Sequence, residues 1–552
     1  MPREMYTIGV DFGTLSARAV VVNVRSGRVH ASAESPYRHA VLSETLPCGT
    51  PLPPQWALQV PQDYLDSLTD AVRSAMAQSG IAAEEVAAIG WDFTSCTVLP
   101  TDSSGTPLCT LPEWECRPHA YCKLWKHHAA QSCAGRIETL AREMEEPFLR
   151  RYGGRVSSEW TYPKLLQILE EDPALTQQID VFLEAGDWLL WQLTGQLRRS
   201  SCAAGFKQFW ADDGSCPTEA FLHALHPDFP ALCRRTLRGE ILPPWKCAGK
   251  LTDDWARRLG LQPGIAVAAG IIDAHAAVIG AGAGRSGQAT VIMGTSSCQL
   301  FVDEKGISVS GICGCAKDSV LPDLYAYESG QPCVGDMLDW FVRRCVSADN
   351  MAEAAGRGIN IHQLLSEKAA ALTPGQSGLV ALDWWNGQRT PFVDDDLSGV
   401  VLGLTLRTRP EELYRALLES CAYGVRLIFD TYRKAGLHAQ EYIACGGIAQ
   451  KNPLMMQLYA DVLGCPIRVC AGDQTCALGA AILASAAAGC YGTLRDAMAA
   501  MAAPTDRTYL PNAKHIPLYD QLYRIYEQSA RHFALHSDVL HRLMALRRGG
   551  DI

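Results

Sequence analysis

The segment Asp11-Phe-Gly13-Thr14 places a carboxylate, a glycine and a hydroxyl directly after the apolar run YTIGV. Glycine lets a backbone turn approach a ligand closely, and successive N–H groups of a turn can point at an anion such as phosphate. Asp11 can hold Mg²⁺ beside that phosphate, and Arg18 can meet a phosphate oxygen. An ordinary hairpin turn explains the same residues, so both interpretations remain open at this point.

A second segment repeats the pattern of the first. Residues 288–302 read QATVIMGTSSCQLFV, and aligning Gly294-Thr295 with Gly13-Thr14 matches the apolar runs on both sides. Self-similarity of this kind indicates a duplicated architecture with one hairpin in each half. Two such turns, the second including Ser296, would clamp ATP between two domains. The chain has no Gly-x₄-Gly-Lys-Ser/Thr run, which excludes a P-loop kinase.

The run Gly282-Ala-Gly284-Arg-Ser-Gly287 matches the glycine spacing G-x-G-x-x-G. A dinucleotide-binding site needs these glycines after a strand and at the start of a helix. Here an Ala-rich helical stretch precedes them and a β-run follows, so the order is reversed. We therefore predict an ordinary loop over this run.

Asp273, in GIIDAHAAVIG, lies between an apolar strand and a predicted helix. In that position an aspartate can cap the helix. It can also project from the strand end into a cleft. Phosphoryl transfer to an alcohol needs a group that accepts the hydroxyl proton and orients the oxygen, and a carboxylate suits this role.

Two charged residues lie in aromatic or apolar surroundings: Lys207, in AAGFKQFW, and Glu328, in AYESGQPCVGD. Buried Lys and Glu are rare unless they are paired or bind a ligand, and without further context an exposed loop charge is the default explanation for each. A polyol substrate needs such groups, because each hydroxyl requires a donor or acceptor in a dry pocket.

Gly446-Gly447 follows a predicted strand and precedes a helix that opens at Asn452-Pro453. Paired glycines there can let adenine and ribose lie flat on the backbone, and a plain strand-to-helix turn is the alternative. Residues 473–481, DQTCALGAA, begin another helix and include Ala477. Their small side chains permit close approach of a ligand.

The apolar periodicity predicts the elements that position these residues. Strands are expected within 6–23 and over 86–91, 265–272 and 442–445, and helices over 61–78, 410–435, 452–463 and 475–488. We expect His127-His128 to be a pair on a helix surface, and the last dozen residues to form a frayed tail.

Composition points to an intracellular enzyme. The chain has 552 residues, 48% of them hydrophobic, and a net charge of −10. It is too long for one core, so we expect two domains, 1–269 and 270–552. Scattered charges with an acidic balance argue against nucleic acid and anionic membranes as partners. We expect the 21 cysteines to be reduced thiols in the cytoplasm, because we find no secretion signal and no zinc-ligand spacing.

These motifs together resemble the FGGY family of carbohydrate kinases over residues 6–488. The pieces GVDFGT, MGTSS, ACGGIAQKNP and DQTCALGAA occur in the family's order, and residues 399–419 closely follow its second signature. The resemblance implies an α/β fold class, with two actin/hexokinase-like (ribonuclease H-like) domains around a central cleft. It also implies ATP and Mg²⁺ as cofactors, a small sugar as partner, and a homodimer as one possible assembly.

The family's roles carry over residue by residue. The resemblance implies that Asp273 is the catalytic base and that Lys207, Glu328 and the Ser95 backbone contact the sugar. It assigns Asp11, Gly13, Thr14 and Arg18 to the first phosphate turn. It also implies that Asp11 holds the metal. The second phosphate turn is then Gly294, Thr295 and Ser296. The adenosine side is Gly446, Gly447, Asn452 and Ala477.

Within the family, the chain is most similar to the branch that phosphorylates L-ribulose on its terminal 5-hydroxyl during arabinose use. The residues that carry this likeness are Trp91-Asp-Phe-Thr-Ser-Cys-Thr97, Leu124-Trp-Lys126, Gly205-Phe-Lys207 and Asp383-Trp-Trp-Asn-Gly387. His127 departs from the branch, which usually has an aspartate there. The alternatives are a kinase for D-ribulose, xylulose or ribitol, and a non-catalytic actin-like ATP-binding protein.

Overall fold

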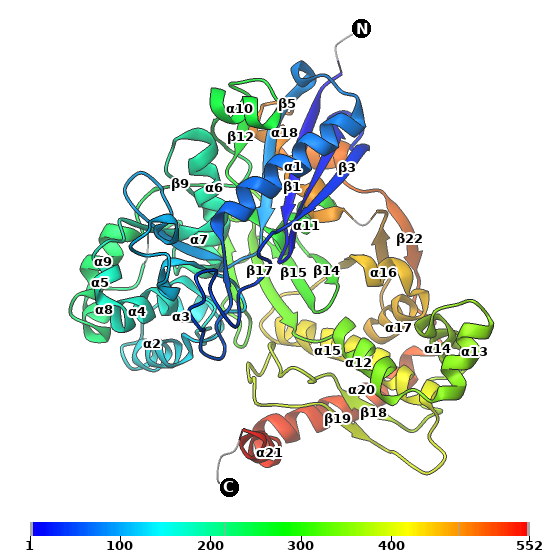
Figure 1. The fold of residues 1–552 in the computed structure, drawn as a ribbon. Helices are drawn as coiled ribbons and strands as arrows, with labels where there is room; N and C mark the ends of the chain where they lie inside the picture. The colour runs from blue at the N-terminus through cyan, green and yellow to red at the C-terminus, as the bar shows by residue number, and fades with distance from the viewer. Residues whose placement is uncertain (1–3, 215, 473, 549–552) are drawn as a thin grey trace. The chain divides into compact units, whose positions relative to one another are not determined.

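The computed structural model describes residues 4–214, 216–472 and 474–548, which form two compact α/β units. The first unit comprises Met1–Gly284, Cys315–Ala326 and Gln474–Ala503, and the second comprises Arg285–Gly314, Tyr327–Asp473 and Pro504–Ile552. This division differs from a single boundary after residue 269. The chain returns to the first unit late in the sequence, and in Figure 1 the orange helix α18 (Thr475–Ala487) lies among the blue strands of that unit.

The first unit is built on a seven-stranded sheet in the order β11-β12-β5-β1-β2-β3, with β13 also paired to β5. Its strands are β1 (Tyr6–Phe12), β2 (Ser16–Asn23), β3 (Val29–Pro36), β5 (Val86–Phe93), β11 (Cys247–Lys250), β12 (Ala266–Ala268) and β13 (Ile271–Ile272). β1 and β2 form the predicted antiparallel hairpin, and β5 runs parallel to β1. β1 and β5 are almost fully buried, as expected for strands covered on both faces.

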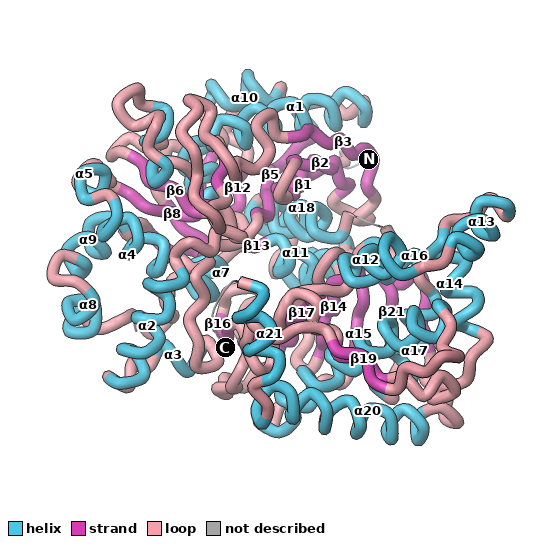
Figure 2. Tube along the Cα trace, turned by 60° about the horizontal axis from the view of Figure 1, so that its bottom comes forward, coloured by secondary structure: helices cyan, strands magenta, loops and turns pink. Residues whose placement is uncertain are grey.

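Helices cover both faces of this sheet. On one face lies α1 (Pro61–Ser79), whose Tyr64, Leu68 and Val72 share a core with Ile8. Proline at its start and left-handed Gly80 after its end are the usual helix boundaries. The other face is covered by α18, which packs on α11 (Asp273–Gly280). Figure 2 shows these two helices side by side beneath the strands.

A close approach of backbones holds α18 against the sheet. A Cβ on Gly9 of β1 would clash with the Ala477 carbonyl oxygen and would lie only 2.7 Å from the Ala481 nitrogen. Where α11 and α18 cross, a Cβ on Gly280 would meet the Thr475 carbonyl, and one on Gly479 would meet the Ala276 carbonyl. The small residues of this region therefore serve backbone packing.

The rest of the first unit contains a second hydrophobic core in addition to that of the main sheet, and some of its elements contribute to the core of the main sheet. A four-stranded sheet has the order β4-β7-β6-β8. Its strands are β4 (Leu58–Gln59), β6 (Val98–Thr101), β7 (Cys122–Lys123) and β8 (Val181–Glu184), and a two-stranded sheet pairs β9 (Arg198–Ser200) with β10 (Glu240–Leu242). The helices are α2 (Gln131–Glu143), α3 (Phe148–Arg151), α4 (Thr161–Glu171), α5 (Pro173–Thr176), α6 (Ala185–Thr194), α7 (Ser201–Lys207), α8 (Glu219–Leu225), α9 (Phe229–Thr236), α10 (Asp253–Leu259) and α19 (Leu494–Met501).

The second unit repeats the plan of the first. Its main sheet has the order β16-β17-β15-β14-β20-β21-β22. The strands are β14 (Gln288–Met293), β15 (Ser297–Asp303), β16 (Gly314–Lys317), β17 (Tyr325–Gln331), β20 (Glu441–Cys445), β21 (Ile467–Cys470) and β22 (Thr505–Tyr509). β14 and β15 form an antiparallel hairpin and β20 runs parallel to β14, as β2 and β5 do around β1. The predicted duplication is confirmed.

The second unit contains eight α-helices in the described part of the chain, of which those near 410–435 and 452–463 were predicted. The eight helices are α12 (Gly335–Cys345), α13 (Ala348–Gly356), α14 (Ile361–Ala370), α15 (Pro410–Lys434), α16 (Gly447–Lys451), α17 (Pro453–Leu463), α20 (Ile516–Arg531) and α21 (Val539–Arg547), and β18 (Val380–Leu382) pairs with β19 (Val400–Leu402). Phe429 and Tyr432 of α15 pack on Phe301 of β15. Residues 282–287 form a loop, as predicted.

The prediction of a frayed tail over the last dozen residues is wrong for most of them. Residues up to Arg547 belong to α21. Two ion pairs hold this helix: His541 Nε2 lies 2.7 Å from Asp394 Oδ2, and Arg548 Nη2 lies 2.6 Å from Asp396 Oδ1. Because both partners are far away in sequence, local composition cannot reveal them.

Candidate active site

The carboxyl edge of the first sheet brings three aspartates together. Asp11 of β1 is directly level with Asp92 of β5, and Ile272 of β13 is level with Phe93, which places Asp273 just beyond this edge. Burial raises the pKa of Asp92 well above its usual range, and the charges of Asp11 and Asp273 act in the same direction. The three carboxyl groups are therefore close enough to interact electrostatically.

Asp273 is the first residue of α11, and the helix cap is the preceding Ile272, which makes no side-chain capping bond. Asp273 Oδ1 accepts the Ala274 N–H at 2.7 Å, which holds the carboxyl group at the start of the helix. The side chain is half-buried. An aspartate that is held in place and partly exposed at a strand end suits a group that takes a proton from a bound alcohol.

Three side chains hold the turn between β1 and β2. Tyr37 Oη donates to the Gly13 carbonyl at 3.0 Å, and Gln59 Nε2 donates to the Thr14 carbonyl at 2.7 Å. Trp125 Nε1 donates to Thr14 Oγ1 at 3.1 Å. Both carbonyls therefore face protein donors. Since the Trp125 bond uses Thr14 Oγ1 as an acceptor, the hydroxyl proton remains able to donate to an anion.

Arg18 makes an ion pair on the neighbouring strand. Its Nη2 lies 2.7 Å from Glu34 Oε2, and Ser16 Oγ donates to the other oxygen of Glu34. Burial raises the pKa of Asp11, while the Arg18 charge partly opposes this. In this structure Arg18 therefore acts on Asp11 electrostatically.

The turn that follows β5 carries Ser95. Lys164 Nζ donates to the Cys96 carbonyl at 2.6 Å and to the Leu124 carbonyl at 2.9 Å, so one buried ammonium group fixes this turn. Lys207 ends α7 and is 4% exposed. Its charge acts on the Cys96 thiol, which places it near the Ser95 turn. Lys207 is therefore a buried residue and not an exposed loop charge.

The second unit contains the matching turn. Gly294, Thr295 and Ser296 connect β14 to β15. The Val334 N–H donates to the Thr295 carbonyl at 2.9 Å, and the Gly335 N–H donates to the Gly294 carbonyl at 3.1 Å. Backbone N–H groups at the start of α12 therefore bond to the carbonyl groups of this turn and hold it in place. In the turn after β1, side chains hold the carbonyl groups instead.

Gly446 and Gly447 follow β20 at the same edge as the β14 turn. Gly446 has a φ of +92°, and a Cβ there would lie 2.5 Å from the Met293 carbonyl oxygen, so only glycine fits. Asn452 has a structural role as the cap of α17, because its Oδ1 accepts the Met455 N–H at 3.0 Å. Glu328 is half-buried on β17.

Ala477 lies in the first unit, fully buried on α18 beneath β1. The first residue of its motif, Asp473, lies outside the described residues. Each unit thus gathers part of the predicted set. Asp11, Gly13, Thr14, Ser95 and Asp273 lie at the carboxyl edge of the first sheet, and Gly294 to Ser296 with Gly446 and Gly447 lie at that of the second.

Sequence reasoning missed Asp92 as a site residue, together with the residues that hold the two turns of the first unit. A signal for Asp92 was present, because IGVDF before Gly13 recurs as IGWDF before Thr94. Gln59 and Lys164 act through backbone carbonyls of distant segments, and such bonds leave no pattern in the sequence.

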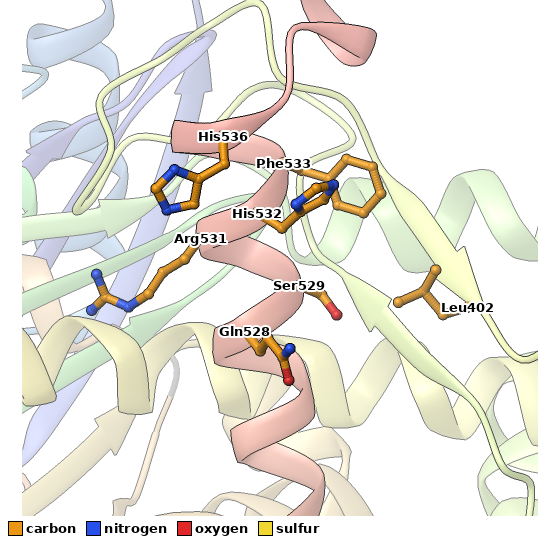
Figure 3. A pocket seen from close by; sticks show the side chains of 7 residues that line it. All are labelled: Leu402, Gln528, Ser529, Arg531, His532, Phe533 and His536. Atoms are coloured by element: carbon orange, nitrogen blue, oxygen red, sulfur yellow. The ribbon is translucent and has the colours of Figure 1, made fainter.

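A surface pocket of about 690 Å³ lies elsewhere in the second unit, lined by Leu402, Gln528, Ser529, Arg531, His532, Phe533 and His536. In Figure 3, His532 and Phe533 extend toward Leu402, while Arg531 and His536 lie on the other side of the helix. None of the predicted site residues lines this pocket.

Comparison with known proteins decides between a scaffold and a kinase. The N-terminal domain model of the FGGY family of carbohydrate kinases matches residues 6–280, and its C-terminal domain model matches residues 289–488. The chain belongs to the FGGY family of carbohydrate kinases. As a sugar kinase of this family, it uses ATP as the phosphoryl donor.

The chain is similar to ribulokinases along its whole length. It is 46% identical to the ribulokinase of Halalkalibacterium halodurans over 548 residues, 98% of this chain and 97% of that protein. It is 46% identical to that of Shouchella clausii over 558 residues, 100% of each protein.

Solved structures confirm the two-domain actin/hexokinase-like fold. A xylulose kinase from Rhodospirillum rubrum superposes with a TM-score of 0.77 at 24% identity, covering 97% of this chain and 100% of that one. A gluconate kinase from Lactobacillus acidophilus gives 0.80 at 19% identity, with 97% and 99% covered. At such identities the likeness shows the FGGY kinase fold alone. Over the part of the chain that is described, no helix is long and apolar enough to cross a membrane.

His127 proves to be a core residue of this kinase, so the expectation of a surface pair on a helix is wrong. It is fully buried in a turn after β7, with Nε2 3.2 Å from Gln167 Oε1 and Nδ1 accepting the Ala57 N–H at 3.4 Å. Burial lowers its pKa, and the nearby Lys123 and Lys164 add to the effect. A neutral imidazole therefore occupies this position.

Lys123, like Lys164, is a buried lysine whose charge acts on His127. Its Nζ lies 3.1 Å from His119 Nδ1 and 4.3 Å from the centre of the Trp56 ring. Burial lowers the pKa of Lys123 to about 7, and the charge of Lys164 adds to this. The unfolded chain therefore binds an extra proton between about pH 7 and pH 10.5, so this group makes folding more favourable as pH rises through that interval.

We expect Lys123→Met to stabilise the protein relative to wild type near pH 7, and to lose most of that advantage by pH 9.5. The linkage is worth roughly 5 kcal/mol over the full interval. Urea unfolding of both proteins at the two pH values measures the difference, with Lys250→Met as a control at an exposed lysine. The same free-energy difference at both pH values would contradict the assignment.

Proposed function

We propose that this kinase transfers the γ-phosphoryl group of ATP to the terminal 5-hydroxyl of L-ribulose, giving ribulose 5-phosphate for arabinose catabolism. The observation that carries the proposal is the placement of Asp273 beside Asp11 and Asp92 at the carboxyl edge of the first sheet. Whole-length similarity to proteins named ribulokinase supports the choice of sugar.

In this proposal the sugar binds through Lys207, Glu328 and the Ser95 backbone, and Asp273 accepts the proton of the attacking hydroxyl. A buried ammonium such as Lys207 can donate to sugar oxygens without competition from water. The hydroxyls and the remaining N–H groups of Thr14, Thr295 and Ser296 bind phosphate oxygens, while the N–H groups of Gly13 and Gly294 close their own turns onto the Ser16 and Ser296 carbonyls. The carbonyls of the two turns are already bonded to the protein, so each turn is held in place before ATP arrives.

The donor set fits a magnesium ion. Asp11 is a half-buried carboxylate. Both carboxylate oxygens of the adjacent Asp92 are buried, and neither has a partner among the described residues within hydrogen-bonding distance and angle. Mg²⁺ is usually held by one or two carboxylates, phosphate oxygens and water. Asp11 would hold the ion with Asp92 behind it. The ion would neutralise charge on the transferred phosphate.

We assign the sugar and the first phosphate turn mainly to the N-terminal half, and the adenosine side to Gly446, Gly447, Asn452 and Ala477. The glycine pair after β20 supports an adenosine site, because only glycine fits its first position. If the protein closes over its substrates, water is excluded from the site and cannot compete with the sugar hydroxyl as acceptor of the phosphoryl group. A cytoplasmic location accords with the chain's 21 cysteines, which we expect to be reduced thiols.

Sugar-dependent ADP release with Mg-ATP tests the proposal against L-ribulose, D-ribulose, L-xylulose, D-xylulose and ribitol. We expect the highest kcat/KM with L-ribulose. A preference for another of these sugars would overturn the substrate assignment but keep the mechanism. Absence of release with every sugar would contradict the proposed reaction.

We expect Lys207→Ala to lower kcat/KM for L-ribulose by roughly 10- to 100-fold, since a charge-assisted hydrogen bond is worth about 1.5–3 kcal/mol. The loss should appear mainly in the KM for the sugar, with the KM for ATP unchanged. Lys246→Ala, at an exposed lysine, is the control. Unchanged kinetics with L-ribulose would remove Lys207 from the site.

A further inference from the structure

Helix α7 lies between two residues that the proposed function uses. Lys207 is the last residue of this seven-residue helix, and Ser200 is the capping residue before its first turn. The helix is buried along its whole length. It contacts β13, the strand that leads directly into Asp273. The position of Lys207 relative to Asp273 therefore depends on how α7 is held against β13.

The Ser200 hydroxyl group bonds to both segments. Its Oγ donates to the carbonyl of Gly270, which directly precedes β13, at 2.8 Å, and it accepts the Cys202 N–H of α7 at 3.3 Å. A hydroxyl group has one proton and two lone pairs, so a single oxygen atom can make both bonds. Ser200 is 3% exposed and Gly270 is buried. Loss of the hydroxyl group would therefore deprive a buried carbonyl of this donor, which is costly away from water.

The backbone on both sides of this bond is also held in place. The Ser200 N–H donates to Oδ1 of Asp187, a buried residue of α6, at 2.9 Å. Gly270 has a φ of +77°, and a Cβ there would lie 2.8 Å from Trp91 Nε1. This conformation and this close approach both require glycine. Neither partner of the Ser200–Gly270 bond can therefore shift without disturbing a neighbour in the core.

A second contact joins α7 to the start of α11. The ring centres of Phe206 and His275 lie 4.4 Å apart, and both rings are buried. Phe206 directly precedes Lys207, and His275 is two residues after Asp273. The segments that carry these two residues therefore meet at both ends of α7, through a hydrogen bond at Ser200 and a ring contact at Phe206.

We propose that Ser200 is a positioning residue of this kinase. Its hydroxyl group fixes Lys207 relative to Asp273, so that the sugar bound by the lysine presents its hydroxyl oxygen to the carboxylate. The inference rests on the proposed function, because it uses the roles given there to these two residues. A displacement of about 1 Å can reduce the rate of a reaction about 10²-fold. One hydrogen bond at this point is therefore enough to affect turnover.

Ser200→Ala in the full-length protein tests this role. We expect kcat with L-ribulose to fall by roughly 10- to 100-fold. The KM values for the sugar and for ATP should stay close to those of wild type, because Lys207 and the phosphate turns are still present. Sugar-dependent ADP release measures both parameters, and thermal unfolding checks that the variant is folded at the assay temperature.

Thr218→Ala is the matched control. Thr218 caps α8, another seven-residue helix of the first unit, by accepting the Phe221 N–H, and it is exposed. This variant loses a helix cap but no bond to β13, so its kcat should equal that of wild type. Wild-type turnover in Ser200→Ala, or equal losses in the two variants, would overturn the proposal.

A double variant shows whether Ser200 acts through Lys207. When Lys207 is replaced by alanine, the position of the lysine relative to Asp273 no longer matters. Ser200→Ala should therefore lower kcat much less in the Lys207→Ala background than in the wild-type protein, because residues that act together give non-additive effects. The same factor in both backgrounds would mean that the two residues act independently, which would contradict the proposal.

Deuterium exchange tests the link without any activity. In Ser200→Ala, backbone amides should exchange faster in the peptides that cover 198–207 and 268–276, since both segments lose the same bond. Faster exchange in α7 alone would overturn the link. If the wild type releases no ADP with any sugar, the proposed function fails. The exchange experiment still decides in that case whether Ser200 joins the two segments.

Discussion

Replacement of Asp273 by alanine should reduce turnover by roughly 10²- to 10⁴-fold, the usual contribution of a general base. The carboxyl group is held at the start of α11 and lies beside Asp92, where it can accept the proton of an alcohol. ATP binding should persist, because the phosphate turns and the glycine pair do not involve this side chain. Sugar-dependent ADP release measures the loss, and calorimetric titration with ATP measures the binding.

Asp253→Ala is a matched control for that experiment, because Asp253 is also the first residue of a helix, α10, and is exposed. It should retain wild-type turnover. Full activity of Asp273→Ala would exclude the proton-accepting role. Loss of ATP binding together with turnover would instead indicate a structural defect at the start of α11.

Gly479→Val should destabilise the first unit by at least about 3 kcal/mol. Any Cβ at this position meets the Ala276 carbonyl oxygen and lies 3.1 Å from the Gly280 nitrogen, so α11 and α18 would have to move apart. Overpacking of a tight core costs about 1–3 kcal/mol, and backbone atoms cannot rotate away as side chains can. Chemical denaturation followed by tryptophan fluorescence measures the change.

Gly135→Ala is the corresponding control. It replaces a helical glycine of α2 around which the structure leaves open space. Alanine favours a helix by about 1 kcal/mol over glycine, so this variant should be as stable as wild type or slightly more so. If Gly479→Val proved equally stable, the close approach of α11 and α18 would be refuted.

Patterns that are local in the chain predicted much of the fold. Apolar periodicity identified α1 and α15 almost to the residue, since each helix has one buried face and begins with proline. The repeated Gly-Thr turns predicted the duplicated hairpins, because both flanks of each turn are buried strands. The FGGY motifs then indicated the kinase family, which the family comparison confirms.

Features that depend on distant contacts could not be predicted in this way. The sequence around His127 is polar, yet the side chain is buried because Trp56 and Gln167 surround it. The small residues near Ala477 suggested approach of a ligand, whereas in the structure they also admit Gly9 of β1 and helix α11. Asp92 shares its motif with Asp11, but only the sheet register places the two carboxylates side by side.

The return of the chain through α18 has a consequence for synthesis on the ribosome. Strands β1 and β5 end by Phe93, but the helix that covers one of their faces begins at Thr475. At about 5–20 residues per second, roughly 20–80 seconds separate the two. During that time this face of the sheet has no permanent cover. The first unit therefore begins to form early and is completed only near the end of translation, so a nascent chain that stalls before α18 should be a substrate for chaperones.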